Sequence, residues 1–232
     1  MVIGKKITFG FFAALVCAAG LYFYVTGLPH DNAGNSAYAS GAAGHTIESF
    51  DLEKALAPRF IGDENAPVKV DEYASLTCGH CATAHLQTLP AIKERYVDSG
   101  QVKLVYNDFP LNAAALDAAV IARCLPEERY FRFIDFLFRT QDQWAFSQNY
   151  QQSLRQNAKL LGATDELLDF CLANQELRQG IVAHMQAMAE KFDISSTPTF
   201  VINDEEVVRG AVSAGVLGQA IDNFIKESPA AE

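Results

Sequence analysis

Two cysteines, Cys78 and Cys81, stand two residues apart in the segment SLTCGHCATA, directly after a stretch that begins by alternating apolar and polar side chains. That stretch, 68–74, has the period of a half-buried β-strand. The residues from Cys78 to about Ser99 have a helical composition, and Pro90 is expected to kink the helix. The sequence therefore predicts that a strand leads into the cysteine pair, which begins the first turn of a helix.

Cysteines at this spacing serve several kinds of site. Haem attachment requires a histidine directly after the second cysteine, and Ala82 stands there instead. A structural zinc site needs four ligands, and the other cysteines of the body, Cys124 and Cys171, are far apart in helical context. A purely structural disulfide across so short a loop would remove little entropy from the unfolded chain. The context favours a redox pair, with zinc and a structural disulfide left as weaker alternatives.

A redox pair at a strand–helix junction has a physical mechanism. The unpaired backbone N–H groups and the dipole of a helix N-terminus stabilise negative charge on sulfur. Cys78 is therefore expected to be an exposed thiolate of low pKa, and Cys81, one turn further on, the shielded resolving thiol. His80 lies between them and adds to this stabilisation if it is protonated or donates a hydrogen bond.

The remainder of the body predicts an α/β fold with an all-helical insertion. Residues 100–110 alternate as a second strand, and no good strand is found from 113 to 192, where four or five helices are expected. Two short strands joined by a turn are expected at 197–204 and 205–210, and a last helix at 213–227. This order predicts a parallel strand pair, a hairpin beside it, and helices on the faces of the sheet.

The N-terminal segment differs in kind from the body. Lys5 and Lys6 precede a long run without charge, ITFGFFAALVCAAGLYFYV. Its length is close to the roughly 20 residues of a spanning helix and exceeds the about 7–15 residues of a signal-peptide core. We therefore expect 1–25 to be a membrane anchor, with the body outside the cytoplasm. A signal peptide cleaved after AYA at 37–39, or a lipidated Cys17, is the alternative.

Residues 26–45 are rich in Gly, Ala, Ser and Asn and are expected to form a flexible linker before a single domain at 46–228. The net charge of -10 argues against nucleic acid as a partner. Apart from the cysteine in the apolar run, the body has four cysteines, and an even number in an exported domain suggests two disulfides.

The CGHC segment at its strand–helix junction, together with Thr197 and Pro198 at the start of a late strand, resembles the thioredoxin superfamily. The helical block between these two halves resembles specifically the DsbA-like thiol:disulfide oxidoreductases, over about residues 60–227. The resemblance implies that Thr197 and Pro198 pack against Cys78, with a cis bond before the proline. It also implies that the backbone beside Pro198 pairs with an extended substrate peptide.

The resemblance gives Glu72 a role as well, because DsbA-like proteins have an acidic residue at this place, beneath the active site, that helps to move the proton of the second cysteine. Alternation places Glu72 on the same face as Val68 and Val70, and a buried carboxyl has a raised pKa. A solvated edge glutamate is the alternative. Cys124 and Cys171 are expected to form a structural disulfide that staples the helical insertion, with two free buried thiols as the alternative.

Three features depart from the family pattern. Gly79 stands where the best-known DsbA proteins have proline, and Thr197 resembles the threonine of disulfide isomerases. No lysine of the second strand clearly matches the family's basic partner, although Lys103 is nearby. Because the residues between the cysteines tune the reduction potential, Gly79 puts strong oxidising power in doubt. Gly79 and Thr197 together favour an isomerase or reductase, so the direction of the redox chemistry stays open.

The sequence thus predicts a periplasmic or otherwise extracytoplasmic thiol:disulfide oxidoreductase without cofactor or metal. Its expected partners are reduced exported proteins and a membrane, quinone-linked protein that reoxidises it, and its N-terminal segment is expected to contact the membrane. A disulfide isomerase or reductase is the first alternative. A non-enzymatic surface or copper-handling protein is the second, although Pro198 beside the cysteines should hinder copper binding.

Overall fold

The structure is a computed structural model that describes residues 50–227. The predicted anchor or signal segment at 1–25 and the predicted linker at 26–45 lie outside the described residues. Among the helices that the structure does describe, none combines the length and apolarity that a bilayer crossing requires.

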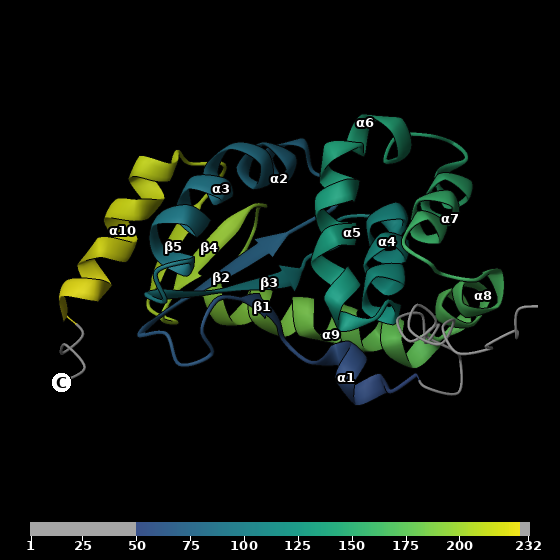
Figure 1. The fold of residues 1–232 in the computed structure, drawn as a ribbon, viewed down its shortest axis with the longest axis horizontal. Helices are drawn as coiled ribbons and strands as arrows, with labels where there is room; N and C mark the ends of the chain where they lie inside the picture. Colours follow the sequence, from purple (N-terminus) through teal and green to yellow (C-terminus); the bar gives the residue numbers. More distant parts are fainter. Residues whose placement is uncertain (1–49, 228–232) are drawn as a thin grey trace, which may run out of the picture. The chain divides into compact units, whose positions relative to one another are not determined.

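A mixed sheet of five strands, in the order β1-β3-β2-β4-β5, forms the centre of the domain (Figure 1). β2 (Val68–Ala74) and β3 (Val102–Asp108) pair in parallel, and β4 (Thr199–Ile202) is antiparallel to both β2 and β5 (Glu206–Arg209). These four strands and their directions agree with the prediction. β1 (Arg59–Ile61) pairs antiparallel with β3 and was not predicted, because three residues are too few to show a period.

Helices cover both faces of this sheet. Their bounds in chain order are α1 Leu52–Leu56, α2 Gly79–Thr83, η2 Ala84–Thr88, α3 Leu89–Ile92, η3 Lys93–Val97, α4 Ala113–Cys124, α5 Glu127–Arg139, α6 Gln141–Trp144, α7 Tyr150–Leu160, α8 Asp165–Ala173, α9 Gln175–Phe192 and α10 Ala214–Glu227. The segments α2 to η3 follow one another without a break and correspond to the single helix predicted after Cys78, with two π-helical stretches. Pro90 lies in the first turn of α3, where a missing N–H costs least.

The two faces of the sheet are covered by different helices. Val70 and Phe200 belong to a core that includes Leu217 and Ile221 of α10, whereas Val201 packs on the side of α9. Figure 1 shows α2 and α3 above the sheet, α10 at its left-hand end and α9 below it. The α2 face carries the cysteine pair.

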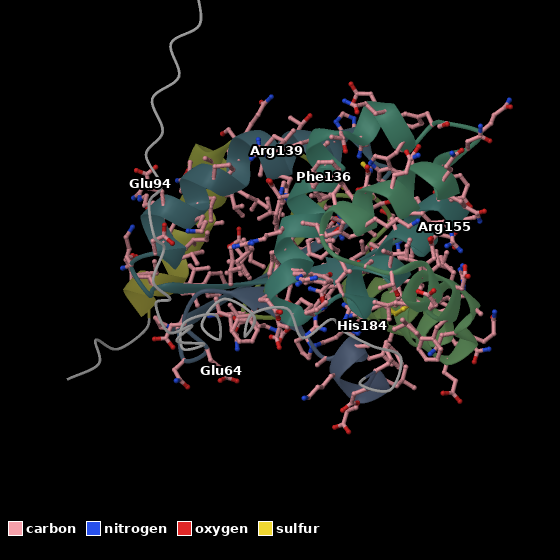
Figure 2. All side chains as sticks on the ribbon, turned by 45° about the vertical axis from the view of Figure 1, so that its right-hand side comes forward. Glu64, Glu94, Phe136, Arg139, Arg155 and His184 are labelled. Atoms are coloured by element: carbon pink, nitrogen blue, oxygen red, sulfur yellow. A yellow bond between two sulfur atoms is a disulfide. The ribbon has the colours of Figure 1, made fainter. Side chains whose placement is uncertain are left out.

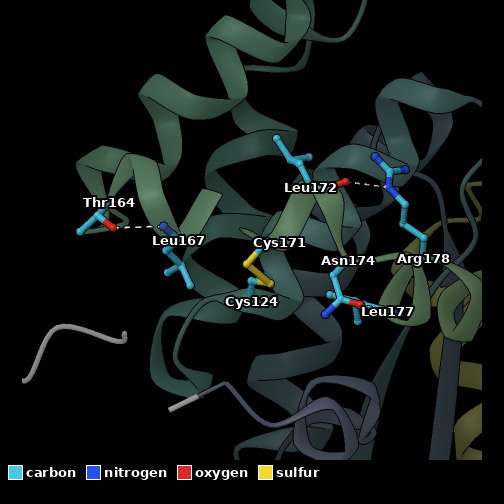
Figure 3. The surroundings of a disulfide bond; sticks show 8 residues. All are labelled: Cys124, Thr164, Leu167, Cys171, Leu172, Asn174, Leu177 and Arg178. Atoms are coloured by element: carbon cyan, nitrogen blue, oxygen red, sulfur yellow. Dashed lines mark hydrogen bonds between the residues drawn. A yellow bond between two sulfur atoms is a disulfide. The ribbon is translucent and has the colours of Figure 1, made fainter. Parts of the chain in front are cut away.

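The segment between β3 and β4 is all-helical, as predicted, but it holds six helices instead of four or five. The additional one is α6, whose four residues are too few for a helical period to be visible in the sequence. A disulfide joins Cys124, the last residue of α4, to Cys171 in α8 (Figure 3). It fixes these two helices of the insertion to each other.

One buried ion pair joins the insertion to the sheet. Arg123 of α4 donates from Nε to the Asp108 carboxylate at the end of β3 and from Nη1 to the carbonyls of Ala55 and Ala57. Both charged side chains are almost fully buried. The carboxyl end of β3, and with it the side of the sheet that leads to the cysteines, is therefore held by α4 and by the start of the domain.

Candidate active site

Cys78 and Cys81 lie where the sequence predicts them, at the junction between β2 and the helix that follows. Cys78 is the N-cap residue of α2, and its backbone N–H donates to the carbonyl of Ser75 over 3.0 Å. Both cysteines are free thiols. Cys78 is half-buried while Cys81 has 0% of its surface exposed, so only the first sulfur can be reached from solution.

The environment of Cys78 strongly favours its thiolate. The pKa of this thiol is lowered from an ordinary 9.0 to about 5, first by a hydrogen bond from the Cys81 thiol. The Thr197 hydroxyl and the backbone N–H groups of Cys81 and His80 lower it further, against the opposing effect of burial. The same hydrogen bond to Cys78, together with burial, raises the pKa of Cys81 well above its ordinary value. One thiol is thus prepared to ionise and the other to keep its proton.

The loop before β4 closes the site from the other side. The peptide bond between Thr197 and Pro198 is cis, and the Sγ atom of Cys78 lies 3.4 Å from the carbonyl oxygen of Thr197. The Thr197 hydroxyl has no hydrogen-bond partner among the described residues, so it is available to donate to the sulfur once Cys78 is ionised. Thr197, which precedes the cis-proline, therefore lies against Cys78.

His80 contributes through its backbone rather than through its ring. Its side chain is exposed and makes no hydrogen bond or ion pair within residues 50–227. Its backbone N–H, in contrast, is one of the donors that lower the pKa of Cys78. The imidazole was expected to stabilise the Cys78 thiolate, but the structure shows no hydrogen bond or ion pair between them.

Glu72 is buried on β2, with only 1% of its surface exposed. Burial raises the pKa of its carboxyl from 4.5 to about 8, and its Oε1 atom has no hydrogen-bond partner among the described residues. Its neighbour in the parallel register is Tyr106 of β3. Burial first, and then the charge of the nearby Asp108 carboxylate, raise the pKa of Tyr106.

Among residues 50–227, no lysine of β3 lies opposite Glu72 in the register. Lys103 lies opposite Lys69 in the register and donates its Nζ to the carbonyl of Glu64, over 3.2 Å. The residue opposite Glu72 is a tyrosine, which the alternation of the strand did not reveal because the register between β2 and β3 is a tertiary property.

Two side chains that hold the cysteine loop were not predicted. Gln141 of α6 donates from Nε2 to the carbonyls of Leu76 and Cys78, over 2.9 and 3.1 Å, and is 5% exposed. Asn112, the N-cap of α4, donates from Nδ2 to the Thr77 hydroxyl over 3.0 Å. An asparagine before an alanine-rich helix is a recognisable cap signal, but nothing in the sequence around Gln141 indicates its contact with a segment more than sixty residues away.

The second cysteine pair lies inside the insertion, away from the loop that carries Cys78. Figure 3 shows Cys124 and Cys171 joined at the end of α8. Close to them, Asn174 caps α9 by accepting a hydrogen bond from the backbone N–H of Leu177 over 2.9 Å. Both cysteines are buried. Among residues 50–227, no group of three or more His, Cys, Asp or Glu side chains could hold a metal ion.

The fold and the site together define a class: a thioredoxin-like α/β domain with a C-x-x-C pair at a strand–helix junction, a cis-proline loop against the first cysteine, and a helical insertion. A family model described as thioredoxin matches residues 54–223, and the chain belongs to this family. A structure of α-DsbA1 from Wolbachia pipientis has a TM-score of 0.68 and 28% identity, covering 73% of this chain and 92% of that one. Within the thioredoxin superfamily the protein is therefore DsbA-like.

Curated relatives carry names of the same kind. A protein of Rickettsia bellii, named provisionally as a protein-disulfide oxidoreductase, is 29% identical over 169 residues, 72% of this chain and 64% of its own length. A relative in Rickettsia felis with the same provisional name is 30% identical, over 72% of this chain and 60% of its own. The chain thus spans somewhat less than two thirds of these relatives. The Bacillus subtilis protein BdbD, at 20% identity and a TM-score of 0.61, shares the fold.

Proposed function

We propose that this protein is a thiol:disulfide oxidoreductase whose Cys78–Cys81 pair exchanges disulfides with other proteins. The observation that carries the proposal is the contrast within the pair: a reachable Cys78 with a pKa of about 5 beside a buried Cys81 whose pKa is raised. A stabilised thiolate is a good leaving group, and this makes the disulfide form of the pair oxidising. The names of the relatives agree with such an activity.

In the oxidising direction, a substrate thiolate attacks Cys78 of the disulfide form, and the sulfur of Cys81 leaves. Glu72, whose carboxyl is largely protonated below its pKa of about 8, supplies the proton that Cys81 takes up. A second substrate thiolate then attacks the mixed disulfide, and Cys78 leaves as its stabilised thiolate. The substrate gains one disulfide and the pair gains two electrons, which a separate oxidant must remove.

We further propose that the protein works outside the cytoplasm, on reduced exported proteins, held to a membrane by its N-terminal segment. The charge pattern of the first 25 residues supports an anchor. The buried disulfide between Cys124 and Cys171 supports an oxidising compartment, because such bonds are rare in the cytosol. The proposed acceptor of the electrons is a membrane protein linked to quinones. The backbone beside Pro198 is the proposed binding place for an extended substrate peptide.

Thr197 beside Cys78 keeps isomerisation or reduction as the second candidate direction. Oxidation of a reduced substrate and refolding of a scrambled one, measured with the same preparation, separate the two: an oxidase is faster on the first and an isomerase on the second. A copper-handling role is tested by metal analysis of the reduced protein, in which stoichiometric copper would favour that role.

The activity is tested by substituting each cysteine in turn. Cys78→Ser should abolish disulfide transfer to a reduced substrate, because the attacked sulfur is removed. Cys81→Ser should accumulate mixed disulfides between Cys78 and substrates, because the resolving thiol is lost. The matched control is Cys124→Ser with Cys171→Ser, which leaves the pair intact. Full transfer by Cys78→Ser would overturn the assignment.

A further inference from the structure

A cavity of about 250 Å³ opens beside Glu72, on the side of the sheet that carries α2. Glu72 of β2, Tyr106 of β3 and His85 of η2 line it, and α5 closes it with Asp135 and Arg139. The apolar part of its wall consists of Ile61, Leu89, Pro90, Leu104 and Phe131. The cavity therefore extends from the buried carboxyl to a helix of the insertion.

Three buried polar atoms around this cavity lack hydrogen-bond partners among the described residues: Oε1 of Glu72, the hydroxyl of Tyr106 and Nδ1 of His85. Buried polar atoms are nearly always hydrogen-bonded, to protein or to ordered water. A space of this size has room for several water molecules, and polar partners on several sides are what such waters need. Water molecules in this cavity would supply the hydrogen-bond partners that the three atoms lack.

The outer end of the cavity leads to solvent. His85 Nε2 lies 3.4 Å from the Asp135 carboxylate, whose side chain is 42% exposed, whereas Glu72 is 1% exposed. Arg139 holds Asp135 through a hydrogen bond of 2.8 Å, and Figure 2 shows Arg139 at the outside of the molecule on the α2 side of the sheet. The charged and titratable groups around His85 are Glu72, Tyr106, Lys93, Asp135 and Arg139.

The imidazole of His85 is suited to pass on protons. Burial lowers its pKa, and the neighbouring Asp135 carboxylate counters that effect in part. A neutral imidazole has one nitrogen that accepts and one that donates, so it can take a proton on one side and release one on the other.

We propose that this cavity is a water-filled passage that carries protons between the buried Glu72 carboxyl and solvent, with His85 as the relay at its outer end. The proposal rests on the proposed function, in which Glu72 exchanges a proton with Cys81. When Cys81 resolves a mixed disulfide on Cys78, its proton passes to Glu72. Its sulfur then bonds to the sulfur of Cys78, and the partner's thiolate leaves. Because the Glu72 carboxyl is largely protonated near neutral pH, it can accept the proton of Cys81 only after its own proton has passed through the cavity to His85 and out.

The experiment uses the reduced protein and an aromatic disulfide whose thiolate is coloured. Attack by Cys78 releases one coloured thiolate, and resolution by Cys81 releases the second. In His85→Ala the first release should keep its rate, and the second should slow about tenfold or more near neutral pH. Added imidazole should restore the second release, because it can enter the space left by the ring, while an equal ionic strength of sodium chloride should not.

His184→Ala is the matched control. His184 is also partly buried and pairs with Asn107 over 3.0 Å, but it lies on α9, on the opposite side of the sheet from Arg139 in Figure 2. Both releases should keep their rates in this variant. A similar loss of the second release in His184→Ala would overturn the assignment to the cavity beside Glu72.

Two results with His85→Ala would overturn the proposal: a second release at the wild-type rate, or a slow second release that imidazole does not restore. Because the His85 ring packs on Phe138 at 4.6 Å between centroids, His85→Gln is made as well, to keep the volume without the relay. A second release at the wild-type rate in His85→Gln also overturns it. If wild-type protein itself shows no second release, the resolving role of Cys81 fails instead.

Discussion

Cys78 owes its low pKa to its neighbours, and Cys81 contributes more than any other. The thiol of Cys81 donates to the sulfur of Cys78 and stabilises the charge there. The two residues therefore differ in acidity because each changes the pKa of the other in the opposite direction, in addition to the effect of the helix N-terminus. A single C-x-x-C pair thus supplies both the attacking and the resolving group.

We predict that Cys81→Ala raises the pKa of Cys78 from about 5 toward its ordinary 9.0, because the strongest donor to the thiolate is lost. Cys81→Ser, which retains a donor, should raise it less. The ultraviolet absorbance of the thiolate, titrated against pH and checked by the rate of alkylation, measures both variants. An unchanged midpoint in Cys81→Ala would show that the helix and Thr197 alone stabilise the charge.

Glu72 should make the stability of the protein depend on pH. Its pKa is about 8 in the folded protein and 4.5 as the ordinary value, so the folded state retains a proton that the unfolded state loses. The free energy of unfolding should therefore fall as the pH rises from about 4.5 to about 8. Glu72→Gln should remove this part of the pH dependence. The free energy of unfolding of the variant should therefore rise relative to that of the wild type as the pH rises. Urea unfolding across this range tests it, and parallel curves for the two proteins would contradict the buried, uncharged carboxyl.

At the scale of elements, the site is assembled from four parts of the chain: the end of β2, the start of α2, the loop before β4, and α6. The contribution of α6 is the least expected, because this short helix belongs to the insertion and not to the sheet. Through Gln141, it fixes the carbonyls on either side of Thr77. The insertion therefore reaches the reacting sulfur by way of the backbone.

We predict that Gln141→Met raises the pKa of Cys78 and lowers the free energy of unfolding by about 1–3 kcal/mol. The substitution keeps the length of the side chain but leaves buried carbonyls without a donor. Gln143→Met, on an exposed position of the same short helix, is the control and should change neither quantity. Loss of stability with an unchanged thiolate titration would limit Gln141 to a structural role.

The sequence allowed the prediction of those elements whose period is long enough to be visible. β2 and β3 each have seven residues, and both were predicted, as were the cysteine pair and the loop at Thr197. β1 and α6 are too short to display a period, and the contact of Gln141 with the cysteine loop depends on how the insertion packs. The tyrosine opposite Glu72 follows from the register of two strands, which alternation alone leaves undetermined.

For the whole molecule, the second cysteine pair should matter for stability and not for chemistry. The Cys124–Cys171 disulfide closes a loop with a sequence separation of 47. By lowering the entropy of the unfolded chain, a loop of this length stabilises the folded state by about 4 kcal/mol. Replacing both cysteines with alanine should lower the melting temperature while disulfide transfer survives below it. Thiol counting by mass under stepwise reduction should find Cys78 and Cys81 first. Release of all four thiols at the mildest step would contradict a protected disulfide.

Cys78 and the residue that closes its site, Thr197, are 119 positions apart. A ribosome therefore completes the reactive cysteine long before it completes the loop that covers it. Until β4 has been made, β2 also has an open edge with unpaired backbone groups. Cys124 and Cys171 are synthesised within this interval, so in the growing chain the correct pairing of these two must compete with exchange through Cys78.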